Sequence, residues 1–190
     1  MCSLIRCVGA WVLGAWVVVG CADKPSNAAR SFYNVDSLVN EQVHALAKHE
    51  LAKSVKINGK EEQTRFTPDS TQWGNELEIF RQLDQVNKAS YRDAYVVSDA
   101  RDLTSNLTVR EIKAQRPVPV TLFRVYYLHT PDDVRKIEAT FVEENTLYVN
   151  TRRMILELER NHVLQRFRVE GSQKMVMSDS VHFVIAGSIE

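Results

Sequence analysis

The chain has 190 residues, of which 44% are hydrophobic and 25% are charged, and its 24 basic side chains balance its 24 acidic ones. This composition excludes a disordered tail, a collagen-like chain and a protein with many membrane spans. A net charge of zero also argues against a nucleic-acid partner, because such binders need surplus lysine and arginine to displace counterions. We therefore expect one ordinary globular domain.

The first twenty residues have the features of a secretion signal. Arg6 precedes an uncharged run of 13 residues over positions 7–19. As a helix this run covers about 20 Å of a hydrocarbon core about 30 Å thick, which is short for a membrane span and suits a signal peptide. An uncleaved anchor is the alternative, but the polar stretch that begins at Ala22 disfavours it.

The end of this segment resembles a bacterial lipobox. Val18-Val19-Gly20-Cys21 places aliphatic residues and a small residue before a cysteine. The resemblance implies cleavage between Gly20 and Cys21, and lipidation of Cys21 with a diacylglycerol on its sulfur and an acyl chain such as palmitate on its new amine. The other cysteines, Cys2 and Cys7, lie before the cut, so Cys21 is the one thiol left after processing.

A lipid on Cys21 implies a place in the bacterial cell envelope, because two or more acyl chains hold a protein on a membrane. Ala22 follows the cysteine instead of an acid, which in the enterobacterial sorting rule favours the outer membrane, facing the periplasm. We expect a lipoprotein signal peptide over residues 1–20, a flexible tether over 21–31 and a single α+β domain over 32–190.

The first half of the domain contains the patterns of two helices with a hairpin between them. Apolar residues at helical spacing follow Asp36, which we expect to cap the first helix. They are Leu38, Val39, Val43 and Leu46. Asn58-Gly59 predicts a hairpin over residues 53–66. Thr67-Pro68-Asp69 predicts the start of a second helix with the proline in its first turn. Its expected buried residues are Trp73, Leu77, Phe80 and Leu83, with Ile79 and Val86 beside them.

The second half has the alternation of antiparallel strands, with turn signals at spacings of about 8–13 residues. We place one of these turns at Glu170-Gly171-Ser172. The expected strands cover residues 92–98, 107–114, 119–128, 134–143, 146–157, 162–170, 173–178 and 181–188. Two amphipathic N-terminal helices with an intervening hairpin, packed on an antiparallel β-meander sheet, make an α+β fold.

The sequence contains no recognised catalytic motif. Residues 21–190 have no glycine-rich phosphate loop, no G-x-S-x-G elbow, no H-E-x-x-H and no calcium loop. We therefore expect no catalytic residue, no cofactor and no metal, and favour a protein that is not an enzyme. His129, beside Asp132-Asp133, or His162 with His182 could form a site with a carboxylate if the strand register allowed it, but turn chemistry after Pro131 is the simpler interpretation of Asp132-Asp133.

Arginines recur along the expected strands and predict one candidate binding site. The anions that guanidinium groups match include a phospholipid head group and a glycan carboxylate. The candidate anion-binding residues are Arg152, Arg153, Arg166 and Arg168. The alternative is a solvated sheet face on which acids pair with arginines across strands. The acids concerned are Glu138, Glu143, Glu157 and Glu170.

Several stretches look like an uncharacterised family of lipoproteins common in Bacteroidota. The resemblance covers residues 32–95 and implies the location and the fold described above, without adding a catalytic residue. Its motifs are Glu41-Gln42, Lys53-Ser54-Val55, Asn58-Gly59-Lys60, Trp73, Glu76-Leu77, Phe80, Asn87-Lys88 and Tyr91.

These observations predict a membrane-anchored envelope lipoprotein that acts as a non-enzymatic binding or assembly factor. Its partners would be the membrane, through the N-terminal lipid, and an envelope protein or a lipid. A carrier whose sheet curves round an acyl chain or a small apolar ligand is the first alternative. A periplasmic hydrolase is the second.

Overall fold

The computed structural model describes residues 32–190, so Gly20, Cys21 and the rest of the predicted signal and tether lie outside the described residues. Residues 32–190 belong to one compact unit. In this part of the chain no helix has both the length and the apolar character that crossing a membrane requires. The helices are α1 (Val35–Ala45) and α2 (Ser70–Arg81), followed by the 3₁₀ segments η1 (Gln82–Asn87) and η2 (Ala89–Ala94).

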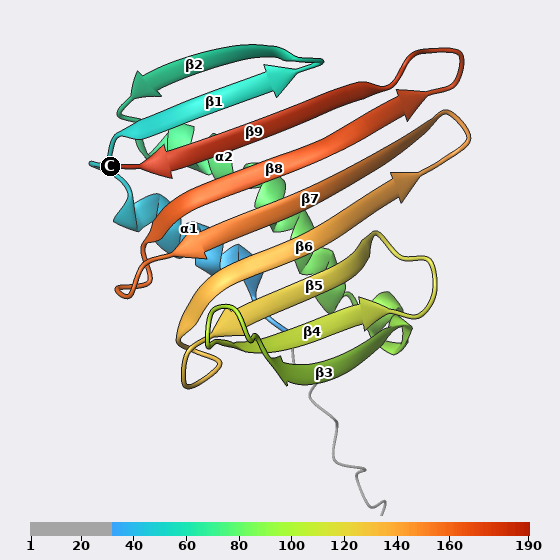
Figure 1. The fold of residues 1–190 in the computed structure, drawn as a ribbon, viewed down its shortest axis with the longest axis horizontal. Helices are drawn as coiled ribbons and strands as arrows, with labels where there is room; N and C mark the ends of the chain where they lie inside the picture. Colours follow the sequence, from blue (N-terminus) through green and yellow to red (C-terminus); the bar gives the residue numbers. More distant parts are fainter. Residues whose placement is uncertain (1–31) are drawn as a thin grey trace, which may run out of the picture. The chain divides into compact units, whose positions relative to one another are not determined.

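The strands form one nine-stranded antiparallel sheet in the order β2-β1-β9-β8-β7-β6-β5-β4-β3 (Figure 1). Each strand from β3 to β8 pairs with the next one in the chain, and β1 pairs with β2 and with β9. The predicted antiparallel sheet is therefore confirmed. The strands are β1 (Leu51–Ile57), β2 (Lys60–Phe66), β3 (Tyr95–Arg101), β4 (Thr108–Ala114), β5 (Val120–Tyr127), β6 (Val134–Glu144), β7 (Tyr148–Leu158), β8 (Leu164–Met175) and β9 (Val181–Ile189).

The predicted hairpin is present, but both helix starts differ from the prediction. Asn58 and Gly59 form the turn between β1 and β2 with φ values of 47° and 88°. Asn34, and not Asp36, caps α1, because its side chain accepts the Ser37 N–H and leaves Asp36 in the first turn. Asp69 caps α2. The proline before Asp69 therefore stands ahead of the helix and not in its first turn.

The expected turn at Gly171 is wrong, because β8 runs through it without interruption. Gly171 faces a close neighbour: a Cβ built on it would lie 2.2 Å from the Thr151 carbonyl oxygen. Gly187 of β9 is similarly confined, since its Cβ would lie 2.2 Å from the ring of Phe167. Both glycines therefore allow close approach within the sheet.

Helices α1 and α2 lie behind the sheet in Figure 1 and bury one of its faces. The predicted buried residues of the second helical stretch are confirmed, with Leu83 and Val86 buried from η1 and Ile79 partly buried. A buried glutamine fastens α1 to the turn between β7 and β8. Gln42 Nε2 donates to the His162 carbonyl at 2.9 Å, and Gln42 Oε1 accepts the Leu164 N–H at 2.7 Å.

Alanine at Gly187 should destabilise the domain by about 1–3 kcal/mol, because the Phe167 ring must move to admit a methyl group. Alanine at Gly171 should cost at least as much, since its obstacle is backbone. Gly74→Ala is the matched control: nothing lies within 4 Å of its added Cβ, and alanine in a helix interior should stabilise by about 0.5–1 kcal/mol. Urea unfolding measures all three. Equal midpoints for the wild type and the two sheet variants would contradict this packing.

Candidate functional site

The face of the sheet opposite α1 and α2, which we call the open face, carries an ion-pair network centred on Glu138. Arg153 donates from Nε and Nη2 to Glu138 Oε1 at 2.9 and 2.6 Å. Lys136 Nζ lies 3.3 Å from Glu138 Oε2, and the Tyr126 hydroxyl donates to the same oxygen at 3.1 Å. Glu138 is buried although it lies on the open face. The network therefore gives the buried carboxylate three partners, Arg153, Lys136 and Tyr126.

The partners of Glu138 decide its protonation. Burial by itself raises the pKa of a carboxyl group, because it disfavours the charged form. The hydrogen bond from Arg153 and the charges of Lys136 and Arg153 outweigh burial and hold the pKa of Glu138 below its usual value. Glu138 is therefore an ionised structural group at neutral pH.

Three of the four predicted anion-binding arginines lie on the open face, each bound to at least one carboxylate. Arg153 also approaches Glu170 at 3.6 Å. Arg168 binds Glu170 through Nε and Nη2, each at 2.9 Å. Arg166 binds Glu157 through the same two atoms at 3.0 and 2.8 Å. The arrangement contains the cross-strand pairs that the sequence suggested as the alternative.

The structure separates Arg152 from the other three arginines, because side chains of neighbouring strand residues point to opposite faces. Arg152 is buried on the helix side, where its guanidinium lies 4.8 Å from the centroid of the Phe141 ring. Its Nη1 donates to Gln82 Oε1 at 3.0 Å, and its Nη2 lies 3.5 Å from Glu143 Oε2. Burial lowers the pKa of Arg152, with Glu143 acting against that shift. Arg152 therefore belongs to the margin of the core.

A groove of about 710 Å³ runs over the open face where β1 and β9 meet. Its floor consists of small side chains from these two strands. They are Ala52, Ser54, Ala186 and Ser188. The register aligns the floor with longer side chains on both sides, because Ala52 and Ser188 pair with each other and with Arg65 and Arg166. The groove therefore exists because small side chains of β1 and β9 lie between long side chains of β2 and β8.

One wall of the groove comes from β2 and the other from β8. Arg65 and Gln63 stand on the β2 side, and Arg166 and Arg168 stand on the β8 side, next to Ile155 and Glu157 of β7. The three arginine side chains remain 47–64% exposed. Arg65 Nη1 lies 3.1 Å from Glu190 Oε2.

Guanidinium donors remain available in the groove. Arg166 and Arg168 use Nε and Nη2 for their carboxylates, which leaves Nη1 outside both pairings. A guanidinium group has five N–H donors in a fixed plane and can serve a second acceptor. The groove can therefore offer hydrogen bonds to an anionic or strongly polar ligand.

The histidines do not meet as the sequence suggested. His162 lies in the turn before β8, whereas His182 pairs with Ser172 near the opposite end of that strand. His129 and His162 instead face the same acid: His129 Nδ1 and His162 Nε2 lie 3.7 and 3.8 Å from Asp133. These histidine side chains are 79% and 50% exposed. Within residues 32–190, no group of three or more His, Cys, Asp or Glu side chains is placed to hold a metal ion.

Side chains fill the space between the helices and the sheet. The largest fully buried side chains include Trp73 and Phe80 of α2 and Phe123 of β5. The groove described above lies on the other face, and a second hollow lies beside the turn between β7 and β8. Neither of these two hollows lies between the helices and the sheet.

Comparison of the chain with protein-family models, curated proteins and solved structures finds no match.

Sequence reasoning found one wall of the groove and missed the rest. The arginines of β8 stood out as recurring cations, but the floor and the β2 wall depend on the pairing of β1 with β9. That pairing joins residues more than 120 positions apart, such as Leu51 and Ile189. The run of small residues Ala186-Gly187-Ser188 was the available sequence signal for the groove floor, but it indicates a groove only once β1 and β8 are known to flank β9.

Replacing Glu138 with glutamine should destabilise the domain at pH 7 by about 1–3 kcal/mol, since Arg153 and Lys136 lose a charged partner. A lowered folded-state pKa adds stability that is present above the unfolded value of about 4.3 and is lost as pH falls through the folded value. The deficit of Glu138→Gln should therefore shrink on acidification below pH about 4. Urea unfolding at several pH values tests this, with the exposed Glu62→Gln as control. A deficit that is constant with pH, or no deficit, would contradict the assignment.

Proposed function

We propose that this chain is a membrane-anchored envelope lipoprotein whose domain acts as a non-enzymatic binding or assembly factor through the open-face groove. The observation that carries the proposal is the groove itself, a hollow of about 710 Å³ with a floor of small residues between walls that carry three arginines. Its size falls in the range of about 300–1,000 Å³ that is usual for ligand sites. The α+β arrangement supports this use, because both helices occupy the other face.

The chemistry of the walls favours a ligand that carries carboxylate or phosphate groups. Arg65, Arg166 and Arg168 line the groove together with one acid, Glu157. Guanidinium groups bind such oxygens through charge-assisted hydrogen bonds, which are stronger than neutral ones. An acidic segment of an envelope protein, or an anionic glycan or lipid head group, has the required groups.

Lipidation of Cys21 and residence on the outer membrane, facing the periplasm, complete the proposal. They rest on the lipobox of residues 18–21, on Ala22 after the cysteine, and on the resemblance to the Bacteroidota lipoproteins. Both properties are predictions from the sequence.

A carrier of a small apolar ligand is the second candidate, favoured by the same volume and by Ala52, Ala186 and Ile155 in the lining. The arginines at both walls weigh against a purely apolar cargo, because their exposed guanidinium groups would lose water without gaining an acceptor.

Cells that express the chain with radiolabelled palmitate should incorporate label into the wild type and lose it on Cys21→Ser. Cys2→Ser and Cys7→Ser are the matched controls, since these thiols lie before the proposed cut and should not carry lipid. Label that persists in Cys21→Ser would refute the anchor and leave the groove untouched.

A photo-reactive amino acid at Ser54, on the groove floor, should crosslink a partner in living cells. The same residue at Ser98, on the open face of β3 and outside the groove, is the control. Arg166→Gln with Arg168→Gln should lower the Ser54 yield roughly tenfold, because a hydrogen bond to a charged group contributes about 1.5–3 kcal/mol. Equal yields at the two positions, or no product at Ser54, would count against the binding function.

A further inference from the structure

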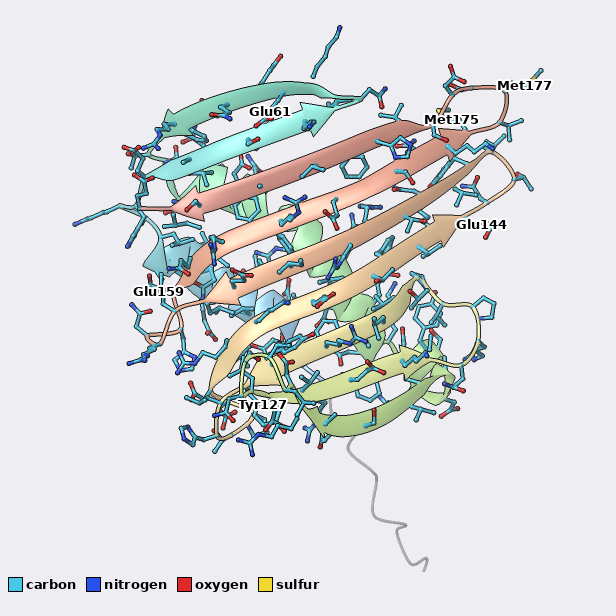
Figure 2. The ribbon with its side chains drawn as sticks, in the orientation of Figure 1. Glu61, Tyr127, Glu144, Glu159, Met175 and Met177 are labelled. Carbon is cyan, nitrogen blue, oxygen red and sulfur yellow. The ribbon has the colours of Figure 1, made fainter. Side chains whose placement is uncertain are left out.

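The ends of two neighbouring hairpins form an exposed apolar projection. We define the apolar tips as Leu147, between β6 and β7, and Met175, Val176 and Met177, where β8 ends and its loop to β9 begins. These residues are 50–102% exposed. The Val176 N–H donates to the Leu147 carbonyl at 2.9 Å, so backbone joins the two hairpins into one surface. Figure 2 labels Met175 and Met177 at this end of the sheet.

Met177 is held in a backbone conformation that its side chain disfavours. Its φ is 64°, in the left-handed region where glycine and asparagine are tolerated best. Asn58 and Asn106 occupy the same region in other turns. The Met177 side chain is fully exposed, so contacts within the domain do not compensate for this conformation. The turn uses this conformation, because the Ser178 N–H donates to the Met175 carbonyl at 3.3 Å, but nothing in the turn requires a large apolar side chain at position 177.

The first described residue contacts a residue at the same end of the strands as the apolar tips. Phe32 packs edge-on against Tyr95, with ring centroids 5.7 Å apart. Tyr95 begins β3, and the antiparallel register places this end of β3 at the same edge as the β6–β7 and β8–β9 hairpin ends. Five strand spacings separate β3 from β8, a lateral distance of about 24 Å.

The chain between Cys21 and Phe32 is short enough for a lipid on Cys21 and the apolar tips to touch the same membrane. Ten residues, 22–31, separate Cys21 from Phe32, and a chain of that length spans at most about 35 Å. A lipid on Cys21 therefore lies within reach of a plane that the apolar tips also touch. This step rests on the lipidation proposed above.

The charges near the apolar tips do not form a basic patch. Lys174 precedes Met175, whereas Asp179 and Glu144 lie on the loop and at the end of β6. One cation against two anions gives no attraction to acidic lipids, so apolar insertion must carry any membrane contact.

We propose that the apolar tips insert into the surface of the lipid bilayer to which the chain is anchored. The lipid then fixes the position of the domain, and the apolar tips fix its orientation, with the strands standing upright on the membrane. Arg168 precedes Met175 by seven residues on β8, which holds the groove about 23 Å from the apolar tips.

The test uses the chain from Ala22 onward, with a hexahistidine tag in place of Cys21, on phosphatidylcholine vesicles that contain a nickel-chelating lipid. Every described helix and strand belongs to the compact unit that this chain retains. It also lacks cysteine, because Cys2, Cys7 and Cys21 are the three in the sequence. One introduced cysteine therefore takes an environment-sensitive fluorophore at a single position, and the tag supplies the anchor whether or not Cys21 is lipidated in cells.

A fluorophore on Met177→Cys should shift to shorter wavelength on the vesicles and be quenched roughly threefold or more by doxyl-labelled lipid. Leu103→Cys is the matched control, since Leu103 is 94% exposed in the turn between β3 and β4 at the other end of the strands. Adding Leu147→Ser and Val176→Ser should remove the Met177→Cys response. A response equal at both positions, or absent at Met177→Cys while the tag holds the protein on vesicles, would overturn the proposal.

Discussion

The core of the domain depends on the contact between the Phe167 ring and Gly187, which leaves no room for a side chain at position 187 of β9. On the helix side, the ring of Phe167 packs edge-on against Phe80 of α2, with centroids 6.0 Å apart, and lies over Gly187 of β9. A side chain at Gly187 would displace that ring and disturb the packing of α2 on the sheet. The neighbours of Gly187 in sequence, Ala186 and Ser188, point to the open face and form part of the groove floor. A short run of small residues in β9 therefore serves both the core and the candidate site.

Strict alternation along the strands sorts the charges between the two faces. Arg152 and Arg153 are adjacent in sequence, yet Arg152 is buried beside Phe141, whereas Arg153 binds Glu138 on the open face. Burial of Glu138 makes its ion pairs less screened than those at the rim. The network is buried near the middle of the sheet and more exposed toward the groove, where the arginine side chains are about half exposed or more. Accessible guanidinium donors therefore lie at the groove and not at the buried centre of the network.

Local patterns predicted the parts of the fold that depend on neighbours in sequence. Helical spacing identified Trp73, Leu77 and Phe80 as buried, and Asn58-Gly59 located the first hairpin. Competition between nearby caps explains the error at the start of α1, since Asn34 and Asp36 can both accept backbone hydrogen bonds. The misplaced turn at Gly171 has another cause. A glycine between polar residues is typical of a turn, but here the close carbonyl oxygen of Thr151 in the neighbouring strand is what requires glycine.

Several motifs on which the predicted resemblance to lipoproteins rests lie where the helices meet the rest of the domain. Gln42 bonds the turn before β8, and Lys53 of β1 lies 2.6 Å from Glu76 of α2. Asn87 accepts the Phe32 N–H and donates to the Tyr33 carbonyl. These residues carry information about the fold, and the one motif residue on the groove floor, Ser54, gave no sign of that position from the sequence. The site depended on the pairing of β1 with β9, which no local pattern encodes.

We propose that a partner occupies the groove in the cell, and thiol accessibility in living cells tests this most directly. Ser188→Cys on the groove floor should react with a membrane-permeant maleimide more slowly in cells than in the purified protein, because the partner covers it. Ser98→Cys, on the same face but outside the groove, should react at the same rate in both settings. Equal rates in cells and in solution at Ser188→Cys would show an empty groove and contradict the account.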